Sequence, residues 1–140
     1  MYQKDYILRM IEMLGDLLRA IFGMITNGQF EQAEKSLHEA YLTTLRKDAS
    51  FFQQIPIEKL TDELIQEHNF TNAHLEILAE LMFAEASLLF SKNKKQESLP
   101  FYHKSLLLFK FVNEAYRVYS RDRIEKMEKI TERLSEIDNS

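Results

Sequence analysis

Five of the six charged residues among the first 26 follow a single stripe along the chain. They recur at intervals of four and three positions, at Asp5, Arg9, Glu12, Asp16 and Arg19. This spacing is the period of an α-helix, so it predicts one long helix over residues 2–26. Nearly every other position there is apolar. The helix therefore has far more apolar surface than the stripe of about 100° with which a surface helix packs.

Five further helices are predicted. Short turns connect them, except between the second and third, where the stretch SFFQQIPIE lies. Their apolar positions recur at helical spacing, while glycine and proline are few and runs with the period of a strand are missing. The pattern predicts an all-α domain of about six helices in antiparallel hairpins, covering residues 1–140. The five helices are expected at residues 30–48, 57–67, 71–92, 96–119 and 121–137.

The turns carry residues that are typical of helix ends. Gly28 follows the first helix, and glycine accepts the left-handed conformation of a C-cap at little cost. Asn69 or Thr71 is the expected N-cap of the fourth helix. Pro100 is tolerated if its helix begins at 96–98, and otherwise we expect a kink.

The last helix reads as a one-faced surface helix that closes the domain. Ser120 is its expected N-cap. Asp122 with Lys126, and Glu125 with Lys129, are favourable pairs four residues apart.

Residues 27–41, with the sequence NGQFEQAEKSLHEAY, carry the most informative spacing. Large and small residues are placed along the second helix so that the small ones allow close helix approach and the large ones fill the groove. These positions, with the preceding turn, are Gly28, Phe30, Ala33, Leu37 and Ala40. The pattern resembles half of a tetratricopeptide repeat (TPR), a hairpin of two helices.

A poorer copy of this pattern lies 65 residues further along the chain. Ser98, Tyr102 and Ser105 follow a turn at Asn93, and Lys95 replaces the first aromatic residue. Since the TPR period is about 34 residues, the short helix between the copies breaks the register. The chain thus resembles the TPR family without forming a regular array, and it is similar to an uncharacterised bacterial family of TPR-like proteins. The resemblance implies a right-handed superhelical bundle and a bacterial source, but no activity.

TPR modules commonly bind peptides on the concave face formed by the first helix of each hairpin. The matching positions here include Leu18, Phe22, Phe83 and Ser87. They lack the Lys, Arg and Asn residues with which some family members hold a terminal carboxylate. The resemblance therefore implies that any groove is apolar and takes a helix or an apolar segment.

The excess apolar width of the first helix has two interpretations. Either this helix is central and surrounded by the others, or its outer side docks a protein partner. On the second interpretation we expect the contact surface to include Leu8, Met13, Leu18 and Phe22. A homodimer that uses the same surface, repeated across a two-fold axis, is the alternative.

Composition narrows the range of partners. The net charge of −4 disfavours binding to nucleic acid, since an acidic chain gains no general attraction to phosphates. Four charges within residues 7–25 exclude a membrane span there. The chain has no cysteine and no recognisable secretion signal, so we expect a cytoplasmic protein.

No constellation of residues indicates catalysis, a metal or a cofactor. The four histidines lack metal-ligand spacing, the glycines are scattered, and no serine lies in a nucleophile elbow. Carboxylates four residues apart, Glu63 with Glu67 and Glu76 with Glu80, are expected on solvated helix faces. We therefore expect a non-enzymatic interaction or scaffold protein.

A carrier of a small apolar ligand is the alternative from another functional class. It requires an internal cavity of about 300 Å³ or more between the helices. Phe83, Phe90 and Phe109 are the expected lining.

Overall fold

The computed structural model describes residues 2–116 and 119–139, with side chains placed from residue 9 onward within these ranges. The described part contains seven α-helices, one short 3₁₀ helix and no strand, so the prediction of an all-α fold is confirmed. None of its helices is long and apolar enough to cross a bilayer. The elements are α1 (Tyr2–Thr26), α2 (Phe30–Leu45), α3 (Ala49–Gln53), η1 (Ile57–Lys59), α4 (Leu60–His68), α5 (Asn72–Ser91), α6 (Lys95–Tyr116) and α7 (Arg121–Asp138).

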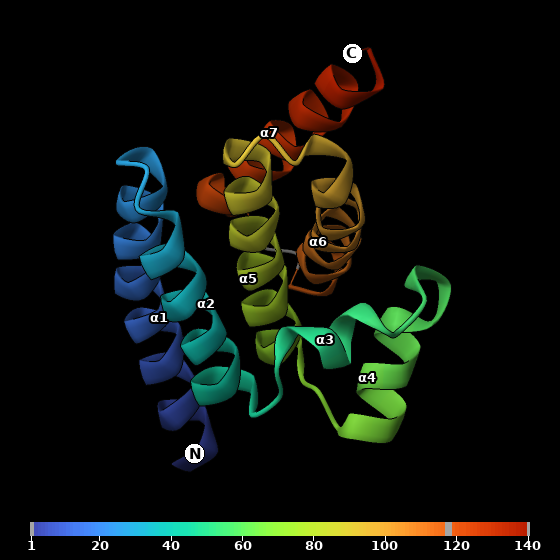
Figure 1. The fold of residues 1–140 in the computed structure, drawn as a ribbon. Helices are drawn as coiled ribbons and strands as arrows, with labels where there is room; N and C mark the ends of the chain where they lie inside the picture. Colours follow the sequence, from blue (N-terminus) through green and yellow to red (C-terminus); the bar gives the residue numbers. More distant parts are fainter. Residues whose placement is uncertain (1, 117–118, 140) are drawn as a thin grey trace.

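The helices form two antiparallel hairpins, α1/α2 and α5/α6, with α5 in the centre (Figure 1). Helix α5 contacts α1, α2 and α6, while α7 packs on α6. The short elements α3, η1 and α4 leave the bundle between the hairpins and return to the start of α5 (Figure 1). The interpretation of the first helix as the central one is wrong. Helix α1 lies at one side of the bundle, and the charged residues of its stripe from Arg9 to Arg19 are exposed.

Both hairpins turn through the same hydrogen-bonded motif. In the first, Gly28 has φ 75°, and the amides of Gln29 and Gly28 donate to the carbonyls of Met24 and Ile25. In the second, Asn93 takes the place of Gly28 with φ 67° and the same pair of bonds. This is the Schellman motif, in which a left-handed residue satisfies the last carbonyls of a helix. The predicted C-cap at Gly28 is present, and Asn93 is its equivalent.

Helix α3 was not predicted from the sequence. It has only five residues, too few for a helix to be stable by itself in water. The Asp48 side chain accepts a hydrogen bond from the amide of Phe51 at its start. At its end, the Lys104 ammonium donates to the carbonyls of Phe52 and Gln53. A side chain distant in sequence therefore caps this helix, and local patterns cannot reveal it.

The remaining helix ends agree closely with the sequence. Thr71, one of the two expected caps, forms a capping box with His74, while Asn69 ends α4 in the left-handed conformation. Helix α6 begins at Lys95, one residue before the expected start, and continues through Pro100. Proline leaves the carbonyl of Gln96 without its helical donor, but Gln96 is exposed, so water can bind there.

Three positions of each TPR-like pattern lie in the core. The small residues bring α2 and α6 close to α5, and the Ser105 hydroxyl donates to the Ala79 carbonyl of α5 at 2.8 Å. Phe30 is half-buried and Gly28 is exposed. The fully buried positions are Ala33, Leu37 and Ala40 in α2, and Ser98, Tyr102 and Ser105 in α6.

Helix α5 also carries an ionisable group into the interior. Burial, with a smaller contribution from the Glu34 carboxylate of α2, raises the pKa of Glu85 to about 7, and Lys92 opposes part of the shift. The Tyr41 hydroxyl of α2 is buried without a hydrogen-bond partner in the described part of the chain. Burial raises the pKa of Tyr41, and the charge of Glu85 adds to that shift.

We expect Glu85 to make the folded state less stable as the pH rises. Between about pH 4.5 and 7 the folded state holds a proton that the unfolded chain has lost, so the free energy of unfolding falls with pH. The variant Glu85→Gln should therefore gain stability relative to wild type with rising pH, by up to about 3 kcal/mol above pH 7. Urea unfolding from pH 4 to pH 8 measures this difference.

The exposed residue Glu39 of α2 supplies the control. Glu39→Gln should shift the free energy of unfolding by less than about 0.5 kcal/mol at every pH. A difference between Glu85→Gln and wild type that stays constant over this range would show that Glu85 does not titrate as described.

Candidate functional site

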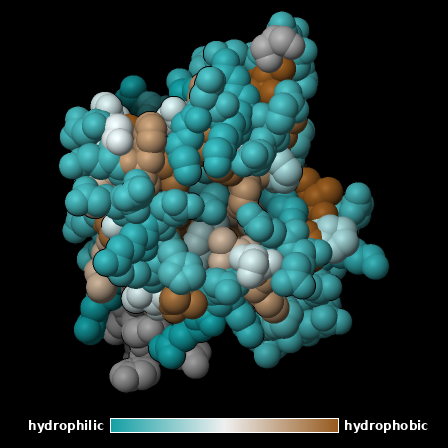
Figure 2. Space-filling view, in the orientation of Figure 1, coloured by the Kyte–Doolittle hydropathy of each residue, from teal (hydrophilic) through white to brown (hydrophobic). Residues whose placement is uncertain are grey.

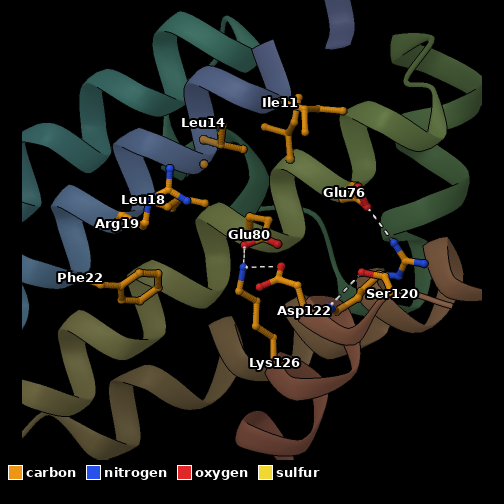
Figure 3. Close-up of a pocket in the computed structure, with 13 residues that line it drawn as sticks. Ile11, Leu14, Leu18, Arg19, Phe22, Glu76, Glu80, Ser120, Asp122 and Lys126 are labelled. Atoms are coloured by element: carbon orange, nitrogen blue, oxygen red, sulfur yellow. Dashed lines mark hydrogen bonds and ion pairs between the residues drawn. The ribbon is translucent and has the colours of Figure 1, made fainter. Parts of the chain in front are cut away.

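A groove of about 450 Å³ runs between α1, α5 and the first turns of α7 (Figure 3). Its floor is apolar, and most of it comes from one face of α1. The positions recur at helical spacing, so their side chains share that face. The apolar floor consists of Ile11, Leu14, Leu18 and Phe22 of α1 with Ile77 of α5.

Gly15 lies in the middle of the α1 face of the groove. A Cβ atom built at this position meets no heavy atom within 4 Å, so the space in front of it is open. Glycine inside a helix costs about 1 kcal/mol relative to alanine. At Gly15 it leaves the helix backbone open to close approach from the groove.

The opposite wall of the groove is charged, and its charges pair between α5 and α7. Arg123 donates to the Glu76 carboxylate at 3.1 Å, and Lys126 pairs with Glu80 and, at 3.0 Å, with Asp122 (Figure 3). The predicted pair of Asp122 with Lys126 is therefore present. The expectation that Glu76 and Glu80 lie on a solvated face is wrong, because their side chains are only 21% and 12% exposed.

Burial affects the ionisation of the carboxylates on this wall. It raises the pKa of Glu80 above its ordinary value, although the Lys126 ammonium acts in the opposite direction. The ion pair thus offsets only part of the cost of removing the carboxylate from water. The pairs join α7 to α5.

The residues predicted to form one contact surface do not all lie on the same side of α1. Phe22 is half-buried and lines the groove, where its ring contacts that of Phe83 at 5.7 Å, and Leu18 is buried in the groove floor. Met13 is 66% exposed. It lies nine positions from Phe22, which places it about 180° around the helix. The side chain of Leu8 is outside the described residues.

The four positions that the TPR resemblance places on the concave face do not all line the groove either. Leu18 and Phe22 line the groove, whereas Phe83 and Ser87 do not. On α5 the lining comes instead from Glu76, Ile77 and Glu80, nearer its start. The face seen in Figure 2 is mainly hydrophilic with scattered small apolar patches, so on that side no broad apolar surface competes with the groove.

A cluster with metal-ligating side chains occurs at the end of α4. Glu63, Glu67 and His68 bring their ligand atoms within 4.8 Å of one another. The His68 ring lies edge-on to Phe51 at 5.0 Å. Exposed acidic groups converge in this way on many surfaces without a metal, and we assign the cluster no role.

Comparison with known proteins leaves the site to be interpreted from its geometry. The sequence matches no protein-family model, and the searches of the curated proteins and of the solved structures return no significant match.

We expect removal of one charge from the groove wall to destabilise the fold. Lys126→Met leaves the Glu80 carboxylate buried without its cation, and the free energy of unfolding should fall by about 2–3 kcal/mol. The loss should be smaller at pH 5 than at pH 8, because the raised pKa of Glu80 lets it take up a proton. Urea unfolding at both pH values provides the measurement.

Two further variants test the cause of this loss. The double variant Glu80→Gln/Lys126→Met removes both charges and should recover most of the stability. Arg121→Gln breaks only the exposed pair with Glu125 and should cost less than about 0.5 kcal/mol. Equal losses for Lys126→Met and Arg121→Gln would contradict a buried role for Lys126.

Proposed function

We propose that this chain is a non-enzymatic, TPR-like interaction module that binds a helical protein segment in the α1/α5/α7 groove. The observation that carries the proposal is the groove itself, whose apolar floor includes the partly exposed side chains of Ile11 and Phe22 beside the buried Leu14, Leu18 and Ile77. Helices α1 and α5 are the first helices of the two hairpins, and α7 follows the second hairpin. In TPR modules the first helices of the hairpins form the peptide-binding face, and two of the four positions expected there, Leu18 and Phe22, line this groove, which supports the proposal.

The shape of the floor favours a helix as the occupant. From Ile11 to Phe22 it extends along α1 for about 16 Å, which equals three turns of an α-helix. An amphipathic helix presents apolar residues at the same spacing and fits such a groove by its apolar face. At Gly15 the missing side chain gives room for this helix to approach the backbone of α1 closely.

The charged wall favours an apolar contact over an ionic one. Glu76 and Glu80 already have cationic partners on α7, so a ligand gains little by pairing with them. The expected ligand therefore carries an apolar stripe with polar residues on either side. Interfaces of this kind have an apolar core and a polar rim.

The carrier of a small apolar ligand has less support. Phe83 and Phe109 are packed in the core, and Phe90 is covered by the guanidinium of Arg133, 3.9 Å from its ring centroid. These contacts occupy the space in which an internal ligand would lie. A second copy of the chain remains an alternative occupant of the groove, and sedimentation of the purified protein over a concentration series distinguishes it from a foreign partner.

The proposal is tested by selecting ligands for the groove and then filling the groove with a large side chain. A displayed library of short amphipathic helices should yield ligands with apolar residues three and four positions apart. Gly15→Trp should weaken their binding at least about ten-fold, because the indole ring occupies the middle of the groove. Fluorescence anisotropy with a labelled, selected peptide measures the affinity.

Gly23 offers a matched control. It lies in the same helix with the same open space around its Cβ position, but it is exposed outside the groove. Gly23→Trp should leave the affinity within about two-fold, and both variants should remain folded by circular dichroism. A library that yields no ligand, or a ligand that binds the Gly15→Trp variant as tightly as wild type, would refute the proposal.

A further inference from the structure

A second cleft, of about 490 Å³, lies between the end of α3, α5 and α6. It is separate from the groove, since its α5 residue Glu85 is five positions from Glu80 and thus about 140° around the helix. Its volume falls within the range of small-molecule sites. The residues around it are Gln53, Glu85, Leu89, Glu97, Pro100, Phe101 and Lys104.

One part of the cleft offers hydrogen-bond donors. The Lys104 side chain is only 8% exposed, and its ammonium donates to the carbonyls of Phe52 at 3.3 Å and Gln53 at 2.9 Å. An ammonium has three N–H groups, so one of them is left for a further acceptor. Gln53 also lines the cleft, and a glutamine side chain carries a further N–H donor group.

Another part offers carboxylates. Glu85 and Glu97 line the cleft, and neither makes a hydrogen bond or an ion pair within the described residues, although Glu85 is largely buried. Glu97 and Lys104 lie seven positions apart on α6. They therefore share one face and are separated by two turns, about 10 Å. The acidic and basic groups face one cavity without neutralising each other.

The surface between these charged groups is apolar. Phe101 and Pro100 come from the turn of α6 between Glu97 and Lys104, and Leu89 comes from α5. The cleft thus combines unpaired carboxylates, an ammonium with a free donor, and an apolar floor.

We propose that this cleft binds a free α-amino acid with an apolar side chain. The ammonium group of the ligand pairs with Glu85 and Glu97, and its carboxylate accepts hydrogen bonds from Lys104 and Gln53. The ligand side chain lies against Phe101 and Leu89. A zwitterion satisfies both kinds of unpaired group at once, which neither a simple cation nor a simple anion does. Charge pairs near the partly buried Glu85 and Lys104 are stronger than fully exposed ones, because the surroundings screen them less.

The test uses L-leucine and L-phenylalanine as probes of the whole chain at pH 8. Calorimetric titration should show binding of at least one of the two. Leucinamide, which lacks the carboxylate, and N-acetyl-leucine, which lacks the ammonium, should each bind at least about ten-fold more weakly than leucine. Failure of both amino acids to bind at millimolar concentration would overturn the proposal. Leucinamide as tight as leucine would indicate a cation site, and N-acetyl-leucine as tight as leucine an anion site; either result also overturns it.

Variants locate the site. Glu85→Gln should weaken leucine binding at least about ten-fold. The matched control is Glu34→Gln, which removes a charge near Glu85 from α2 but does not line the cleft, and it should bind leucine as wild type does. In NMR titrations of the wild type, saturating leucine should lower the pKa of Glu85 below about 7, because an ammonium placed beside it stabilises the carboxylate, as Lys92 does, and opposes the effect of Glu34. Unchanged binding in Glu85→Gln, or an unmoved pKa, would contradict this placement.

Discussion

The whole fold depends on the enclosure of α5. This helix buries apolar residues around most of its circumference, from Leu75 to Leu88, so water is unfavourable for nearly all of its sides. The other helices supply the cover: α6 and α2 pack along it, α1 covers a further side, and α7 reaches it through ion pairs. Two sides of α5 remain partly uncovered. The carboxylates of Glu76, Glu80 and Glu85 lie on these sides.

Both candidate sites follow from this constraint. Glu76 and Glu80 lie where α1 and α7 leave α5 partly uncovered, and Glu85 lies where α6 and α3 do so. A carboxylate on an otherwise apolar helix must keep contact with water, a cation or a ligand, since burial without such a partner is costly. The first two glutamates meet this need with Arg123 and Lys126. Glu85 has no ion-pair partner within the described residues, and its pKa is raised to about 7, which favours the neutral form.

Most of the helices could be predicted from the sequence, but the contacts between them could not. Periodicity located α1, α2, α5, α6 and α7 to within a few residues, because each is long and its ends carry local signals such as Gly28 and Thr71. It missed α3, whose cap is Lys104, and it misplaced α1 as a candidate for the centre. Glu76 and Glu80 lie four positions apart and Arg123 and Lys126 three, so each pair shares one helix face, but such faces on distant segments indicate contact only once the packing is known. Of the predicted contact residues, only Leu18 and Phe22 line the groove. No residue of the second cleft was predicted to belong to a binding site.

The excursion of α3, η1 and α4 between the hairpins has a consequence for the order of folding. Helices α5 and α6 are joined by a three-residue turn, so their pairing closes a short loop. Docking of α1 and α2 on α5 must close the chain over residues 46–71, which costs more conformational entropy. We therefore expect the C-terminal hairpin to form the nucleus, and the N-terminal hairpin to add to it late and to open first. The groove wall contributed by α1 would then belong to the part of the molecule with the lowest barrier to local opening.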